Sequence, residues 1–242
     1  KQQIYKWVNK KVARKSSHII TISNFVKNDL IKFTGVNPEK ITVTLESADE
    51  LPKGNEPVDE LIGKKFIMYI GRPTPHKNLR RLIDAFALLQ KKYPELTLAL
   101  AGKKDSNYAR HETYVNEHAI KNVVFTGFIS DEQLRWMYEN TAAYCFPSLS
   151  EGFGLPGLEA MLHGAPVTSS TATCLPETHG DAAHYFDPFS VEDIAKSIDD
   201  ILSDDKLRNE LVKKGKKHVK TFSWQRMAEQ TLAVYEKYGR KS

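Results

Sequence analysis

Short apolar runs rich in β-branched residues alternate with helical hydrophobic patterns from residue 66 onward. This alternation is typical of βαβ units, which build a parallel sheet covered by helices. Strands are predicted at 66–70, 96–101, 123–126, 142–146, 166–168 and 184–186. The clearest helices are predicted at 79–92, 131–139, 158–163, 191–202 and 206–220. The sequence therefore predicts the α/β class with a parallel sheet.

The connections of such a sheet decide where its polar loops lie. Crossovers between parallel strands are right-handed, so the loops that follow the strands gather at one edge of the sheet. We therefore expect Gly71 and Arg72, Gly102, Gly127 and Glu151 to converge despite their wide separation in the sequence.

The segment from Ser148 to Gly164 carries two carboxylates around a predicted helix start. Glu151 lies in a glycine-rich loop, and Glu159 lies eight residues later inside the helix. The N-terminus of a helix offers free N–H groups and the positive end of its dipole, which suits a phosphate. A ligand with a diphosphate centre and a sugar reaching each carboxylate, which is a nucleotide-sugar, would fill this arrangement. The alternative is a tight strand-to-helix turn with two surface glutamates.

Residues 152–157 also match the G-x-G-x-x-G fingerprint of dinucleotide-binding proteins. Three details count against a dinucleotide. Five residues separate the predicted strand from the first glycine, Pro156 lies inside the triplet, and no acidic residue ends the next strand. A dehydrogenase is therefore the weaker interpretation.

Net charge, hydrophobicity and cysteine content limit the classes of function that this sequence can have. The net charge of +5 permits nucleic acid, lipid or phosphorylated ligands. The basic run 213–220 lacks interleaved aromatic residues, so it is predicted as a solvated helix face and no nucleic-acid partner is expected. No run of 18 apolar residues predicts a membrane span. Cys145 and Cys174 make no disulfide framework, which favours a cytoplasmic location.

The first 45 residues follow a different pattern. Helices are predicted at 1–16 and 24–32, and short strands at 19–22 and 41–44. The first helix places Ile4, Val8 and Val12 on one stripe among basic residues, which predicts packing on a missing partner domain. Peripheral contact with anionic lipid at the inner face of the membrane is the alternative. Residues 46–62 are predicted as a linker, and a chain that begins with Lys1 is expected to be a piece of a longer protein.

The run from Glu151 to Val167 resembles the E-x7-E motif of retaining glycosyltransferases of family 4, which have the GT-B fold. Further segments of this sequence stand in that family's order, at 69–72, 76–78, 98–102, 124–128 and 221–224. The resemblance covers residues 17–235 and is greatest to the bacterial mannosyltransferase-like branch. It implies that the parallel sheet is Rossmann-like and doubly wound, in a nucleotide-sugar-binding domain at 63–222 that forms the C-terminal lobe. Residues 1–45 would be the tail end of the N-terminal, acceptor-binding lobe, and 223–242 a helix crossing back towards it.

The resemblance implies roles for individual residues. Arg72 and Lys77 match the family's two cations, which stabilise the charge on the departing diphosphate; ordinary surface charge near a helix start is the alternative. Glu151 would contact the transferred sugar and Glu159 both ribose hydroxyls. The implied catalytic residues are Arg72, Lys77 and Glu151. The implied donor-binding residues are Gly71, Arg72, Lys77, Thr126, Gly127, Phe128, Glu151, Gly152, Phe153, Gly154, Leu155 and Glu159.

The activity that the resemblance implies is transfer of a hexose from a nucleotide-sugar to a saccharide or lipid-linked acceptor with retention of configuration, in polysaccharide or lipopolysaccharide biosynthesis. The first candidate donor is GDP-mannose, and UDP-sugars are the others. No metal or other cofactor is expected, because the sequence has no Asp-x-Asp pair and no metal-binding spacing of histidines. The missing N-terminal lobe would be the main protein partner, and the chain alone is expected to be inactive or nearly so.

Two further interpretations stay open at this point. A non-catalytic nucleotide-sugar-binding module would share the site but transfer nothing. A glycogen-synthase-like or phosphorylase-like enzyme would share the fold, and a phosphorylase would use inorganic phosphate in place of a nucleotide.

Overall fold

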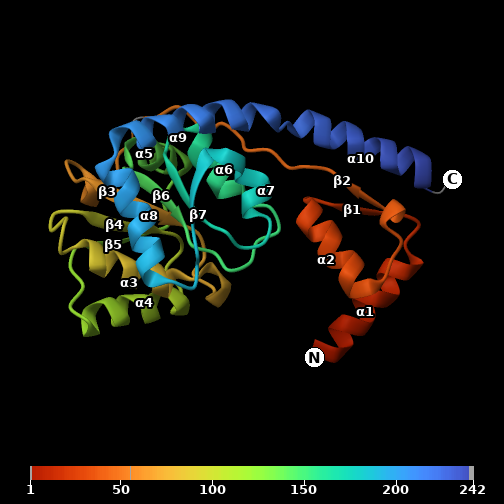
Figure 1. Cartoon of the computed structure of the whole chain (residues 1–242), viewed down its shortest axis with the longest axis horizontal. Coiled ribbons are helices and arrows are strands. Elements are labelled where there is room, and N and C mark those ends of the chain that lie inside the picture. Colours follow the sequence, from red (N-terminus) through yellow and green to blue (C-terminus); the bar gives the residue numbers. More distant parts are fainter. Residues whose placement is uncertain (1, 55, 240–242) are drawn as a thin grey trace. The chain divides into compact units, whose positions relative to one another are not determined.

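The computed structural model describes residues 2–54 and 56–239, and these form two compact units (Figure 1). One unit runs from Ala48 to Lys220. The other joins the described residues up to Ser47 to those from Thr221 on. Lys1 and residues 240–242, which belong to the predicted terminal helices, and Asn55 of the predicted linker lie outside the described residues.

The larger unit is built on a six-stranded sheet in which every strand pairing is parallel. Its strands are β3 (Phe66–Ile70), β4 (Thr97–Ala101), β5 (Val123–Gly127), β6 (Ala143–Phe146), β7 (Val167–Ser170) and β8 (Ala183–Phe186). Their order is β5-β4-β3-β6-β7-β8. The chain thus winds outward from β3 in one direction and from β6 in the other, which confirms the doubly wound, Rossmann-like α/β prediction. Ligands bind such sheets at the carboxyl ends of the strands where the order reverses, here β3 and β6.

Helices connect these strands. They are α3 (Leu79–Leu89), α4 (Ser106–Glu117), α5 (Asp131–Asn140), α6 (Leu155–Leu162), α7 (Leu175–His179), α8 (Val191–Ser203) and α9 (Asp205–His218), with 3-10 turns at Asp59–Leu61, Pro75–Lys77 and Gly180–Ala182. Neither α4 nor α7 was among the predicted helices, and α4 has few buried side chains to give an apolar pattern. The predicted start of α6 at residue 158 is wrong, because Gly154 adopts the left-handed conformation that begins the helix three residues earlier.

Both faces of the sheet are covered. A buried core joins strand residues to α3, α4 and α8, with Tyr69, Phe86 and Ile198 at its centre. On the opposite face, Phe66 stacks on Trp136 of α5 with ring centroids 5.9 Å apart. In Figure 1, α3 and α4 lie below the strands and α5 and α6 above them. Because helices bury both faces, ligands can reach the sheet only at its edges and strand ends.

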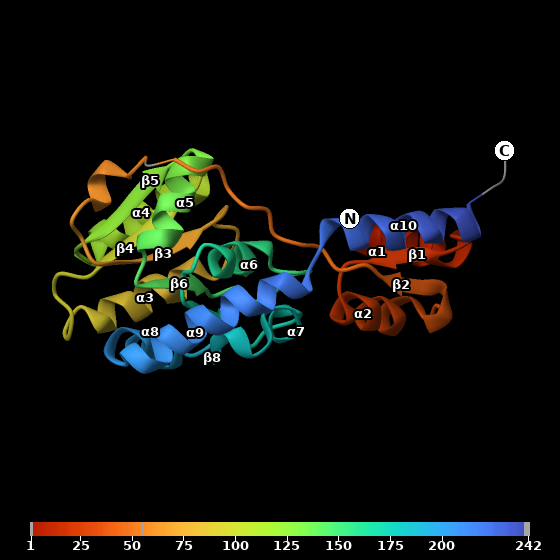
Figure 2. The ribbon, with the colours of Figure 1, turned by 90° about the horizontal axis from the view of Figure 1, so that it is seen from above.

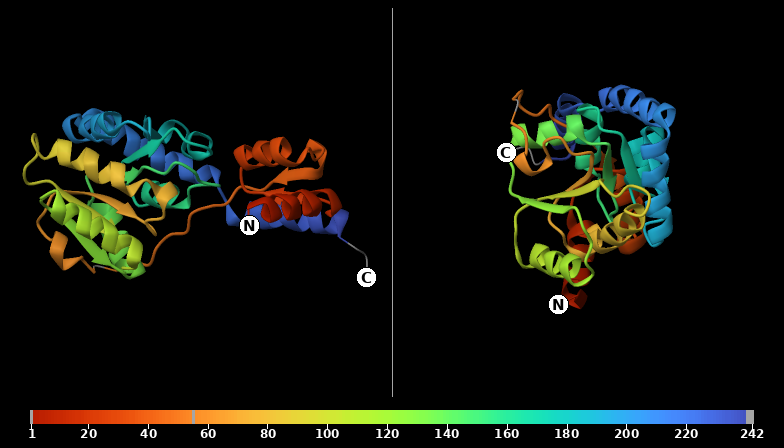
Figure 3. Two further views of the ribbon diagram at one scale, coloured as in Figure 1. Left: turned by 90° about the horizontal axis from the view of Figure 1, so that it is seen from below. Right: turned by 90° about the vertical axis from the view of Figure 1, so that its left-hand side faces the viewer.

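The smaller unit contains α1 (Gln2–Lys15), β1 (Ile19–Thr21), α2 (Asn24–Thr34), the 3-10 turn Pro38–Lys40, β2 (Ile41–Val43) and α10 (Trp224–Tyr238). The two strands pair in parallel. Helix α10 lies beside α1 and β1 (Figures 2 and 3), and Tyr238 stacks on the His18 ring with centroids 4.0 Å apart. The predicted helices and strands of this part are confirmed, and α1 exposes Ile4, Trp7 and Val12.

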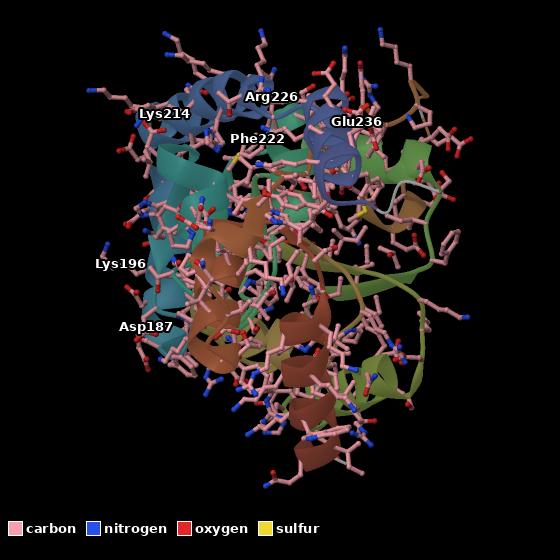
Figure 4. All side chains as sticks on the ribbon, turned by 90° about the vertical axis from the view of Figure 1, so that its right-hand side faces the viewer. Asp187, Lys196, Lys214, Phe222, Arg226 and Glu236 are labelled. Atoms are coloured by element: carbon pink, nitrogen blue, oxygen red, sulfur yellow. The ribbon has the colours of Figure 1, made fainter. Side chains whose placement is uncertain are left out.

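The basic run on α9 lies on a solvent-facing side of the helix. Lys213, Lys216 and Lys217 are exposed, and Lys214 pairs with Glu210 one turn earlier at 2.9 Å. Figure 4 shows Lys214 at the outer surface of its helix. The predicted solvated face is therefore confirmed. In the described part of the chain, no helix combines the length and the apolar character that a membrane span needs.

One helix position tests this packing directly. Alanine in place of a helical glycine ordinarily stabilises a helix by about 1 kcal/mol. A Cβ at Gly157 of α6 would instead overlap the buried ring of His179. We predict that Gly157→Ala lowers the free energy of unfolding by about 1–3 kcal/mol through overpacking, measured by urea denaturation. In a His179→Ala background the same change should be neutral or stabilising; an equal loss in both backgrounds would contradict the predicted overlap.

Candidate functional site

Two loops meet at the carboxyl ends of β3 and β6. Asn78, which follows the 3-10 turn after β3, donates its side-chain amide to the carbonyl oxygens of Pro147 at 3.0 Å and Pro188 at 2.7 Å. The amide of Leu149 donates to the His76 carbonyl at 2.7 Å. Asn78 itself is left-handed, with φ of 58°, a conformation that asparagine tolerates better than most residues. These bonds fix the residues before Asn78 against the loop that carries Glu151.

Lys77 and Glu151 form the central contact between these loops. The Lys77 Nζ lies 2.6 Å from the Glu151 Oε1, and the two side chains are only 23% and 13% exposed. A pair so shielded from water is screened less than a surface pair, and removing one partner leaves a partly buried charge uncompensated. Two residues that the sequence assigned to one site, 74 positions apart, are thus in direct contact.

Arg72 has a different partner. Its Nε donates to the Asp105 Oδ2 at 3.0 Å, and the Arg72 side chain is 73% exposed. Asp105 also caps the start of α4 by accepting the amides of Asn107 and Tyr108. The Asn107 amide is the largest cause that lowers the pKa of Asp105; burial opposes it, and the Tyr108 amide and then Arg72 lower the pKa further. Arg72, Lys103 and Asp105 line a hollow of about 310 Å³. Asp105 was not among the predicted site residues; its signal in the sequence is an N-cap aspartate directly after a strand loop.

Glu159 extends from α6 into a less polar environment. Burial raises the pKa of its carboxyl group, and a hydrogen bond from the Tyr138 hydroxyl, at 3.3 Å from Oε2, opposes that rise. Tyr138 packs edge-on against Tyr144 of β6 with centroids 5.7 Å apart. Within the residues that the structure describes, the buried hydroxyls of Tyr69 and Tyr144 have no hydrogen-bond partner. Both rings belong to the two strands at which the chain order reverses, so polar groups with unused hydrogen-bonding capacity lie under the site.

The start of α6 has the backbone geometry of an anion site. Gly154 begins the helix at φ of 106°, and no described side chain caps it. A Cβ on Gly154 would approach the Leu175 side chain to 2.8 Å, so only glycine fits without a shift. Pro156 has no N–H, and the amide of Gly157 donates to the Gly154 carbonyl at 3.0 Å, so the Leu155 amide is the first-turn donor that a phosphate could meet. Gly152 and Phe153 precede Leu155 in the same loop, and Phe153 is buried.

The remaining predicted residues lie at the ends of β3 and β5. Gly71 follows β3 directly, and the Tyr108 hydroxyl lies 2.9 Å from its carbonyl oxygen. Thr126 and Gly127 end β5, where the Gly127 carbonyl accepts the amide of Gly102 at 3.0 Å. Phe128 is 85% exposed. All of these residues follow or end strands at the carboxyl edge of the sheet, as the topology predicted, although Thr126 and Gly127 belong to the outermost strand.

His179 supports the glycine-rich loop from below. Its Nε2 lies 3.2 Å from the Gly154 carbonyl oxygen and its Nδ1 lies 3.2 Å from the Ser169 hydroxyl. Burial lowers the pKa of this imidazole to about 4. The ring is fully buried. Its support of the loop was not predicted, since no sequence spacing links position 179 to position 154.

A family model described as glycosyl transferases group 1 matches residues 54–218. The chain is 32% identical over 233 residues to the O-antigen chain mannosyltransferase B of Escherichia coli, covering 90% of this chain and 60% of that protein. It is 31% identical over 235 residues to the MMP alpha-(1->4)-mannosyltransferase of Mycolicibacterium hassiacum, covering 95% and 56%. The chain belongs to the glycosyl transferases group 1 family, and it spans somewhat over half the length of these relatives.

The fold is also similar to that of a solved structure, a sucrose-phosphate synthase from Thermosynechococcus elongatus. The TM-score is 0.84 at 24% identity, over 97% of this chain and 61% of that one. This likeness supports the GT-B type of fold.

The buried imidazole of His179 makes the free energy of unfolding depend on pH. A histidine with a folded pKa of about 4 and an unfolded pKa of 6.5 binds more protons when unfolded, so its contribution to stability is present above pH 6.5 and is lost as the pH falls to 4. The full loss is about 3 kcal/mol. We predict that this part of the pH dependence disappears in His179→Gln, measured as the free energy of unfolding by urea from pH 4 to pH 7. Identical pH dependence in wild type and variant would contradict the assignment.

Proposed function

We propose that this chain is the donor-binding part of a retaining hexosyltransferase that takes a hexose from a nucleotide-sugar and passes it to a saccharide or lipid-linked acceptor. The observation that carries the proposal is the Lys77–Glu151 contact at 2.6 Å beside the uncapped start of α6. A cation, a carboxylate and the Leu155 amide at a helix start match the phosphate and hydroxyl groups of such a donor.

Each group has a role in this proposal. The Leu155 amide at the start of α6 and Lys77 hold the diphosphate and stabilise the charge that develops on it as the sugar leaves. Arg72 joins Lys77 in this role when it exchanges Asp105 for the phosphate. Glu151 orients the transferred sugar, and Glu159, about one turn into α6, accepts the ribose hydroxyls. The leaving phosphate assists deprotonation of the acceptor on the same face, which retains the configuration.

The proposed sugar is mannose and the proposed first donor is GDP-mannose, because two relatives at about 30% identity are named as mannosyltransferases. The setting that fits these names is polysaccharide biosynthesis at the cytoplasmic side of a membrane. The proposal includes no metal ion. The residues that contact the acceptor, and any catalytic group on the acceptor side, belong to an N-terminal lobe, which the smaller unit would complete. This chain alone should therefore turn over little or no donor.

Donor binding tests the proposal. We predict that one of a panel of GDP-, UDP- and ADP-sugars raises the melting temperature of the wild-type chain, since a ligand that binds only the folded state stabilises it. Glu159→Ala should weaken that binding by about 10- to 150-fold, the loss expected for hydrogen bonds to a charged group, as measured by calorimetric titration. The control is Glu192→Gln, an exposed change at the start of α8 that should leave affinity unaltered.

Other outcomes separate the alternatives. Binding of inorganic phosphate without nucleotide would favour a phosphorylase-like enzyme, and binding of NAD would favour a dehydrogenase. Binding of a nucleotide-sugar with no transfer once an N-terminal lobe is restored would favour a non-catalytic module. Equal affinity of wild type and Glu159→Ala would refute the assigned site.

A further inference from the structure

Thr173 has a backbone conformation that threonine rarely adopts. It lies between β7 and α7 with φ of 56°, in the left-handed region. A β-branched side chain crowds the backbone there, so such a residue is a genuine conformational outlier. Conformations of this kind persist only where the surrounding structure holds them, and they cluster at functional sites.

The hydroxyl of Thr173 points to a reason for this conformation. Its Oγ1 accepts the backbone amide of Glu151 at 3.0 Å. That amide precedes the side chain whose carboxylate lies 2.6 Å from the Lys77 Nζ. Fixing the direction of the amide limits rotation of the Glu151 backbone, so the hydroxyl of Thr173 helps to decide where the carboxylate lies.

Neighbouring residues hold the same loop at other points. The Ser170 hydroxyl donates to the Ser148 carbonyl at 2.6 Å, the Thr178 hydroxyl lies 2.7 Å from the Phe153 carbonyl oxygen, and His179 contacts the Gly154 carbonyl oxygen. Ser170, Thr178 and His179 are all buried. Because these contacts anchor both ends of the loop, a change at Thr173 acts on the Glu151 turn while the loop as a whole stays in place.

We propose that Thr173 is a positioning residue for the donor sugar. Its left-handed backbone places Oγ1 under the Glu151 amide and so presets the Glu151 carboxylate for the hydroxyls of the transferred sugar. This inference rests on the proposed function, and it extends the site to a residue of the segment between β7 and α7. A threonine with a purely structural role would change stability and sugar binding together, whereas a positioning role separates them.

Three substitutions of Thr173 and a fourth, control variant measure sugar binding and stability separately. Thr173→Ser keeps the hydroxyl, and Thr173→Ala and Thr173→Gly remove it. Only Thr173→Gly relieves the strain. We expect the dissociation constant of the best-bound nucleotide-sugar to rise about three- to tenfold in both the alanine and glycine variants and less than about twofold in the serine variant. Affinity for the free nucleoside diphosphate, which lacks the sugar, should change less than about twofold in all three.

The melting temperature should instead depend on how well each residue tolerates the positive φ at position 173. Thr173→Gly should melt about 2–4 °C above Thr173→Ala, because alanine retains the penalty of a positive φ. The fourth variant, Ala119→Gly, is the control: position 119 also has a positive φ of 51° but lies between α4 and β5. It should raise the melting temperature and leave both affinities unchanged.

Two results would overturn the proposal, and each is distinct from failure of the proposed function. Equal affinity of wild type and Thr173→Ala for a nucleotide-sugar that wild type binds would overturn it while leaving the function intact. If wild type binds no member of the panel, the proposed function fails, and amide hydrogen exchange of residues 149–153 decides the positioning role. Protection lost in Thr173→Ala and kept in Thr173→Ser would support it; equal protection in all variants would overturn it.

Discussion

The contact between Lys77 and Glu151 depends on the reversal of strand order between β3 and β6. Each residue lies on the loop that follows one of those strands, and the carboxyl ends of parallel strands meet at one edge. Asn78 then bonds one loop to the other through its side chain, and its left-handed backbone turns the chain into α3. The ion pair is therefore set by topology first and by local hydrogen bonds second. A different strand order would leave the same two residues far apart.

The site combines a loop whose backbone is fixed by hydrogen bonds with an arginine whose ion-pair partner can change. The Glu151 loop is anchored by Ser170, Thr173, Thr178 and His179, so its backbone is preorganised. Arg72, by contrast, is an exposed side chain paired with Asp105, and exposed ion pairs contribute little stability. Such a pair can be exchanged for a phosphate at small cost. Preorganised acceptors with a mobile cation at the rim suit a site that must bind and then release a charged product.

The sequence predicted the sheet because its strands are short, apolar and regularly spaced. It also predicted that Glu151 precedes a helix and that Glu159 lies inside it, although the predicted helix start was three residues too late. It missed α4, where few buried residues give a periodic pattern. It also missed Asp105, Tyr138 and Thr173. Each of these acts through a contact between segments distant in sequence or through a backbone angle, and neither leaves a local pattern. Arg72 was placed on the correct loop, but its partner could be found only from coordinates.

A crystal structure of this chain with a nucleoside diphosphate would show whether the start of α6 and Lys77 together bind the diphosphate. We expect diphosphate oxygens within hydrogen-bonding distance of the Leu155 amide and the Lys77 Nζ, with the ribose at Glu159. A diphosphate bound elsewhere on the larger unit, with the Lys77–Glu151 contact undisturbed and Glu159 free of ligand, would contradict it.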